Sequence, residues 1–177
     1  MKTIATGLII IYTGDGKGKT TAALGLALRA AGQGLKVQII QFMKGQENIG
    51  EIKALTNCKL PIALKRFGRP GFVQSRACEP LDIYIAVQGM KFFRQVLSFS
   101  DYDMIILDEV LVAIDFGLLK ETALLEVLAS RPPHIHLVLT GRNAPQSILN
   151  MADLVTEMKD VRHPYKMGVK AQVGIEY

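Results

Sequence analysis

A glycine-rich stretch, TGDGKGKTT at residues 13–21, carries the residue types and spacing that most clearly imply chemistry. Its glycines let the backbone turn several N–H groups inward as a nest for anions. Lys19 adds a positive charge for the outer phosphates of a nucleotide, and Thr20 offers a hydroxyl to Mg²⁺. The stretch is therefore predicted to be a phosphate-binding loop. The residues expected to contact the nucleotide follow one another along the chain: Gly14, Asp15, Gly16, Lys17, Gly18, Lys19, Thr20 and Thr21.

The loop departs from the common spacing G-x-x-x-x-G-K-[ST], which would place a glycine where Thr13 stands. Gly14 and Gly16 supply the flexibility instead. A chance glycine turn is the alternative interpretation, but the stretch lies between an expected strand and an expected helix, which favours the loop. Lys17 either contacts phosphate or faces solvent, and the sequence leaves both open.

Two acidic residues, Asp108 and Glu109, directly follow the apolar run 104–107. A buried strand that ends in carboxylates delivers them to the sheet edge where a phosphate loop also lies, so at least one acid is expected to hold Mg²⁺. The alternative is a strand followed by a solvated helix cap, and the sequence does not say which acid binds. Arg142 follows another expected strand, where it either contacts phosphate or substrate or serves only to pack and cap.

Alternating strands and helices must position these residues, which indicates α/β architecture with a mostly parallel sheet flanked by helices. The expected strands span 8–12, 36–43, 62–67, 104–107, 135–140 and 154–158. The expected helices span 20–31, 50–55, 81–97, 120–129 and 145–151. The irregular stretch of about 44–80 is expected to face the substrate, and the tail 161–177 shows no clear period.

The composition is that of an ordinary globular domain, here expected to span residues 1–177. The net charge is +5, with 49% hydrophobic and 21% charged residues. This mild positive charge suits an anionic small molecule better than a nucleic acid. The apolar runs fall short of the ~18 residues that span a bilayer, so no membrane partner is expected. Cys58 and Cys78 lack a CxxC spacing, and the expected location is the cytoplasm.

Several separate stretches together resemble the ATP:cob(I)alamin (corrinoid) adenosyltransferase family of the phosphate-loop type. They follow the family's order along nearly the whole chain, and the C-terminal string is the most telling because other phosphate-loop proteins do not share it. The stretches are residues 12–23, 25–30, 41–45, 107–109, 130–132, 139–142 and 168–177. The resemblance implies a phosphate-loop, RecA-like domain.

The resemblance also implies a reaction, the transfer of the 5′-deoxyadenosyl group of ATP to the cobalt of a reduced corrinoid with release of triphosphate. The corrinoid would be cob(I)alamin or cob(I)yrinic acid a,c-diamide. Cobalt(I) is itself the nucleophile, so the protein must supply position and charge. By the family's pattern, Lys19 neutralises the triphosphate, Thr20 and Glu109 hold Mg²⁺, and Asp108 supports them. A reduced flavoprotein as electron donor and a homodimer are implied in the same way.

Family members use aromatic side chains to displace an axial ligand of cobalt(II), usually through a phenylalanine-x-tryptophan pair. This chain contains no tryptophan, and Phe67 and Phe72 are the nearest candidates to face the corrinoid. Two other functions compete with the transferase. A conventional phosphate-loop ATPase or kinase would form ADP without any corrinoid, and a non-catalytic nucleotide or corrinoid carrier would bind the cofactor without turnover.

Overall fold

The computed structural model, which describes residues 6–45, 49–69, 78–99 and 101–176, contains a parallel 6-stranded sheet in the order β3-β2-β4-β5-β1-β6. The strands are β1 Ile9–Thr13, β2 Val37–Phe42, β3 Ile62–Phe67, β4 Met104–Asp108, β5 His136–Thr140 and β6 Leu154–Glu157. The predicted fold class and all the predicted strands are confirmed. Because the strands are parallel, their carboxyl ends meet at one edge of the sheet, where ligands of such folds bind.

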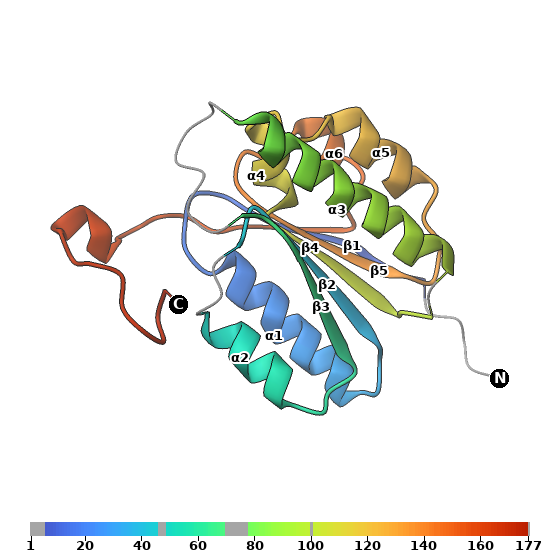
Figure 1. Ribbon diagram of the computed structural model, residues 1–177, viewed down its shortest axis with the longest axis horizontal. Coiled ribbons are helices and arrows are strands. Elements are labelled where there is room, and N and C mark those ends of the chain that lie inside the picture. The colour runs from blue at the N-terminus through green and yellow to red at the C-terminus, as the bar shows by residue number, and fades with distance from the viewer. Residues whose placement is uncertain (1–5, 46–48, 70–77, 100, 177) are drawn as a thin grey trace.

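Helices cover both faces of the sheet (Figure 1). The helices are α1 Lys19–Gly32, α2 Gly50–Asn57, α3 Pro80–Phe99, α4 Val110–Asp115, α5 Glu121–Ala129 and α6 Gln146–Leu149, followed by the 3₁₀ helix η1 Pro164–Met167. α1 and α2 lie on one face, and α3 to α6 lie on the other. The sequence did not predict α4, which is short and begins directly after the two acids.

Strand β4 shows why a continuous apolar run forms the centre of this sheet. Successive side chains of a strand point to opposite faces. Ile105 and Leu107 therefore join the buried cluster under α3 and α5, whereas Met104 and Ile106 join the cluster under α1. Burial on both faces explains why the run contains no polar residue until the strand ends.

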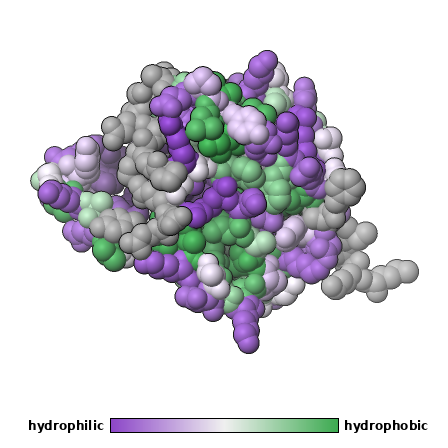
Figure 2. Space-filling model, in the orientation of Figure 1, coloured by the Kyte–Doolittle hydropathy of each residue, from purple (hydrophilic) through white to green (hydrophobic). Residues whose placement is uncertain are grey.

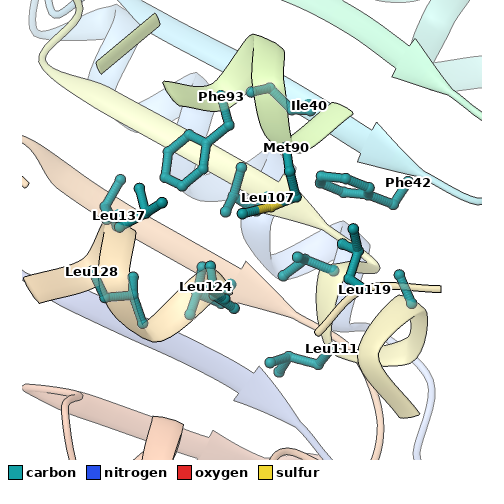
Figure 3. Close-up of a cluster of buried hydrophobic side chains, with 14 of the residues drawn as sticks. Ile40, Phe42, Met90, Phe93, Leu107, Leu111, Leu119, Leu124, Leu128 and Leu137 are labelled. Carbon is teal, nitrogen blue, oxygen red and sulfur yellow. The ribbon is translucent and has the colours of Figure 1, made fainter. Parts of the chain in front are cut away.

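The two layers of the core are built from different side chains. In Figure 3, Phe93 and Met90 of α3 lie over Leu107 of β4. On the opposite face α1 buries alanines, among them Ala23 and Ala27, so this helix packs on the sheet through small side chains. Figure 2 shows hydrophobic side chains toward the middle of one face and hydrophilic side chains around its rim. Within the described residues, none of the helices has the length and apolar character needed to cross a membrane.

Candidate functional site

The predicted phosphate loop connects β1 to α1, and its glycines are required by the backbone. Gly14 has φ 93° and Gly18 has φ 115°, in the left-handed region that side chains disfavour. A Cβ on Gly14 would lie 2.5 Å from the carbonyl oxygen of Met158, and the Gly16 amide donates to that same oxygen at 2.7 Å. The loop is therefore pressed against the chain leaving β6, which explains the glycines that follow Thr13.

Lys19 is the first residue of α1, and its side chain curls back over the loop. Its Nζ atom donates to the carbonyl oxygens of Gly14 at 2.5 Å and of Gly16 at 2.6 Å. Burial and the neighbouring guanidinium of Arg142 lower the pKa of Lys19, while Glu109 and Asp15 oppose this shift. The ammonium thus stands beside one guanidinium and two carboxylates at the mouth of the cavity.

Asp108 ends β4 as a buried acid that is only 1% exposed. Its Oδ1 accepts from the hydroxyls of Thr140 at 2.7 Å and of Thr20 at 2.9 Å. Its Oδ2 accepts from Lys44 Nζ at 2.7 Å and from the Gln41 amide at 3.2 Å. The network joins the ends of β2, β4 and β5 to the first turn of α1, so it fixes Thr20 relative to the sheet.

Lys44 is a residue of the site that was not predicted from the sequence. The residue comes two positions after β2, and its Nζ lies 2.7 Å from Asp108 Oδ2, 2.9 Å from the Thr20 hydroxyl and 3.9 Å from Glu109 Oε1. Although burial opposes the charge, Asp108 and Glu109 raise the pKa of Lys44 above its usual value. Lys44 could have been predicted from its position after the carboxyl end of a strand, because Asp108 was predicted from the same kind of position.

Glu109 precedes α4 with φ 63°, a left-handed conformation that is uncommon for a residue with a side chain. Its backbone N–H donates to the Thr140 hydroxyl at 2.8 Å, which holds this conformation. Burial raises the pKa of Glu109, and nearby Lys44 opposes the rise. The carboxylate lines the same cavity as Lys19.

A cavity of about 760 Å³ opens at this edge of the sheet. The predicted residues Asp15, Gly16, Lys17, Gly18, Lys19, Thr20, Thr21, Glu109 and Arg142 all line it. Arg142 donates to the carbonyl oxygen of Asp15 at 3.3 Å. The structure therefore brings the loop, one of the acids and the arginine into one concave site, with the buried carboxylate of Asp108 behind it.

The C-terminal tail also reaches this cavity, which its lack of sequence period did not foretell. The tail runs out from the sheet, and its end returns to the N-terminal end of α1 (Figure 1). There Glu176 pairs with Lys17 at 2.9 Å and accepts from the Gln172 amide at 2.8 Å. The hydrogen bond from Lys17 lowers the pKa of Glu176. In this structure Lys17 thus has a carboxylate partner at the mouth of the cavity.

Of the two predicted aromatic residues, the structure describes Phe67, which does not line the cavity. Phe67 ends the edge strand β3, and its ring centroid lies 6.5 Å from that of Phe42 and 5.6 Å from that of Phe92. It borders a small separate hollow with Met43. Phe72 lies outside the described residues.

The oxygen donors of the site fit a hard divalent cation such as Mg²⁺. Such a cation is typically held by one or two carboxylates together with waters and phosphates, not by a complete protein cage. Thr20, Asp108 and Glu109 provide hydroxyl and carboxylate oxygens, and the cationic Lys44 Nζ already lies between two of them. The described residues contain no cluster of three His, Cys, Asp or Glu side chains.

Comparison with known proteins decides the family. The sequence profile described as "ATP:corrinoid adenosyltransferase BtuR/CobO/CobP" matches residues 5–177. The chain belongs to this family of enzymes. Within the family, the corrinoid adenosyltransferase of Pseudomonas aeruginosa is 35% identical over 171 residues, covering 97% of this chain and 84% of that protein. The Escherichia coli K12 protein of the same name is 36% identical, covering 97% and 86%.

The fold is shared more widely than the family. The crystal structure of the KaiC-like protein PH0186 from Pyrococcus horikoshii superposes with a TM-score of 0.56 at 14% identity, covering 89% of this chain and 74% of that one. At this identity the likeness concerns the fold alone. The expected phosphate-loop NTPase-like architecture is thereby confirmed.

Proposed function

We propose that this adenosyltransferase moves the 5′-deoxyadenosyl group of ATP to the cobalt of a reduced corrinoid and releases triphosphate. One observation carries the proposal. Lys19 and Thr20 of the loop face the Asp108–Glu109 pair within a cavity that also holds Arg142. This arrangement places an ammonium and a guanidinium beside oxygen ligands where a polyphosphate leaving group would lie.

In this reaction the electron pair of cobalt(I) in the substrate attacks C5′ of ATP. The C5′–O bond breaks, and its electrons leave on the triphosphate oxygen. The nucleophile belongs to the substrate, so the protein contributes in-line position and charge. Lys19 is proposed to neutralise the departing triphosphate together with the backbone N–H groups of residues 14–18.

Thr20 and Glu109 are the proposed ligands of Mg²⁺, and Asp108 is proposed to support them. Bound Mg²⁺ would supply further positive charge against the triphosphate. Asp108 accepts hydrogen bonds from Thr20, Thr140 and Gln41, which leaves it well placed to orient the Thr20 hydroxyl. Arg142, which donates to the carbonyl oxygen of Asp15 and lines the cavity, is proposed to contact phosphate or substrate.

The corrinoid is proposed to approach from the margin of the same sheet edge. Phe67 and Phe72 are the proposed residues that displace the axial ligand of cobalt, and an aromatic cluster at the end of β3 supports this role for Phe67. The natural corrinoid is either cobalamin or a precursor such as the a,c-diamide. A reduced flavoprotein donor, a homodimer and a cytoplasmic location rest on the family resemblance and the composition, and they stay predictions.

Product analysis tests the proposed function. The protein is incubated with Mg-ATP and chemically reduced corrinoid, the cobalt–carbon bond is followed by absorbance, and phosphates are identified by ³¹P NMR. We expect adenosylcorrinoid and intact triphosphate in equal amounts. ADP formed without corrinoid would instead indicate a conventional ATPase or kinase. Tight corrinoid binding without turnover would indicate a carrier, and either result would overturn the proposal.

A further inference from the structure

The ammonium group of Lys44 occupies the space between two proposed metal-site residues. Its Nζ lies 2.9 Å from Thr20 Oγ1 and 2.7 Å from Asp108 Oδ2, and Glu109 Oε1 is 3.9 Å away. Thr20 and Glu109 are the side chains to which the proposed function assigns Mg²⁺, and Asp108 is the one that it assigns to support them. A monovalent cation built into the chain therefore already contacts the oxygens that a divalent cation would need.

The backbone holds Lys44 in this place. Met43 adopts φ 58°, and its amide donates to the carbonyl oxygen of Phe67 at 2.9 Å. A Cβ on Gly68 would lie 2.5 Å from the backbone nitrogen of Lys44, so the chain after β3 packs directly against it. A left-handed residue other than glycine is costly, and such conformations persist where the surrounding structure over-determines them. The turn after β2 is thus fixed so that Lys44 faces the cavity.

The charge of Asp108 explains what Lys44 does there. Its carboxylate is buried, and among its side-chain hydrogen-bond partners in the described part of the chain Lys44 is the charged one, beside Thr20, Thr140 and Gln41. A buried carboxylate without a cation is strongly unfavourable. The Oε1 atom of Gln41 is a further buried polar atom beside this carboxylate, and it has no hydrogen-bond partner in the described structure. The buried carboxylate of Asp108 therefore requires a cation beside it both before and after ligands bind.

We infer that Lys44 is a positioning residue that keeps Thr20 and Asp108 together and that exchanges with the divalent cation. This inference rests on the proposed metal role of the site. An ammonium and a metal ion that contacted the same oxygens would stand close together and would repel each other, which favours exchange over joint binding. The side chain of Lys44 is 20% exposed and lines the cavity, and its flexible stem allows the ammonium to turn toward an incoming triphosphate.

Exchange has a consequence for the order of binding. A metal ion alone must displace a paired ammonium and receives no phosphate oxygens in return, so it binds weakly. A metal ion that arrives with the nucleotide brings a triphosphate, which gives the displaced ammonium a new partner. Lys44 would thus make divalent-cation binding depend on nucleotide.

Binding of Mn²⁺ alone to the nucleotide-free protein tests this inference, with electron paramagnetic resonance and calorimetry as readouts. We expect Lys44→Met to bind Mn²⁺ at least about tenfold more tightly than the wild type, because the competing charge is gone. We also expect its melting temperature to fall without metal and to recover with Mn²⁺. Lys53→Met, at an exposed position of α2, is the matched control and should leave both quantities unchanged.

Lys44→Gln removes the charge but keeps N–H donors for Asp108, and it serves where the methionine variant does not fold. Equal Mn²⁺ affinity in the wild type and in a folded Lys44 variant would overturn the exchange, even with normal binding of Mn-ATP. The proposed function would then stand. Nucleotide binding by the wild type that is indifferent to Mn²⁺ would instead remove the metal role itself, and the exchange with it.

Discussion

The carboxyl edge of the sheet has two regions that differ in how their side chains are held. At the end of β4, Asp108 is buried and accepts four hydrogen bonds from side chains of three other elements and of the turn after β2. At the end of β3, Phe67 is half-buried and contacts the rings of Phe42 and Phe92. Directional polar contacts hold the first region, and non-directional apolar contacts hold the second.

The difference suits the two substrates that the proposed function assigns to this edge. A polyphosphate leaving group requires charges at fixed positions, because electrostatic stabilisation depends on groups that do not reorganise during the reaction. A large, flat corrinoid requires an apolar surface that tolerates small displacements. Changes in the first region should therefore slow the transfer step itself, whereas changes in the second should mainly affect the reduction of cobalt(II).

The largest effect is expected for Lys19→Ala. Removing the ammonium leaves the triphosphate charge uncompensated in the transition state, so kcat/KM should fall on the order of 100-fold or more. Steady-state kinetics with pre-reduced corrinoid measures the loss. Lys59→Ala, at an exposed position outside the cavity, is the control for a lost lysine. Unchanged kinetics in the Lys19 variant would contradict the assignment of the loop.

Asp108→Asn should have the next largest effect, on stability as well as on turnover. The substitution removes the nearest charged partner of the mostly buried Lys44 and leaves it the carboxylate of Glu109 at 3.9 Å, so the free energy of unfolding should fall by about 3 kcal/mol. Turnover should fall about tenfold, because Thr20 loses the carboxylate that orients it. Urea denaturation and kinetics on one preparation separate the two effects. A variant as stable as the wild type would show that the charge pair between Asp108 and Lys44 does not contribute to stability.

Some parts of the fold and of the site could be predicted from the sequence, and others could not. The strands β1, β4 and β5 were predictable, because each is a short, largely apolar run that leads into glycine or acidic residues. The loop, Asp108 and Arg142 were predictable, because each follows such a run. Lys44 was not, although it follows one too, since a lysine after a strand is ordinarily solvated. The contact between Lys17 and Glu176 depends on the path of a tail without regular structure, and residue spacing does not encode such a path.

Phe67→Ala tests the role of the apolar region at the end of β3. We expect turnover from cobalt(II) corrinoid to fall roughly tenfold more, a difference of about 1.4 kcal/mol, than turnover from pre-reduced cobalt(I) corrinoid. Displacement of the axial ligand matters only for the reduction. Leu64→Ala, also partly buried on β3, provides the control for lost packing. Equal losses in both assays would refute the displacement role of Phe67.

The smallest effect is expected for Glu176→Gln, which breaks an exposed ion pair beside the loop. Exposed pairs contribute little, and the negative charge of Glu176 opposes an incoming polyphosphate. The affinity for ATP should therefore rise by less than about threefold, measured by calorimetry, with the melting temperature unchanged. A large loss of affinity would mean that the tail contributes directly to the nucleotide site.

We expect the loop to hold the triphosphate so that C5′ of ATP stays open to a corrinoid. A crystal structure with a non-reactive ATP analogue and Mg²⁺ tests it most directly. We predict the triphosphate among the loop amides, Lys19 and Thr20, with C5′ facing the open mouth of the cavity. Density that leaves the loop empty, or that buries the sugar beyond the reach of a macrocycle, would contradict the account.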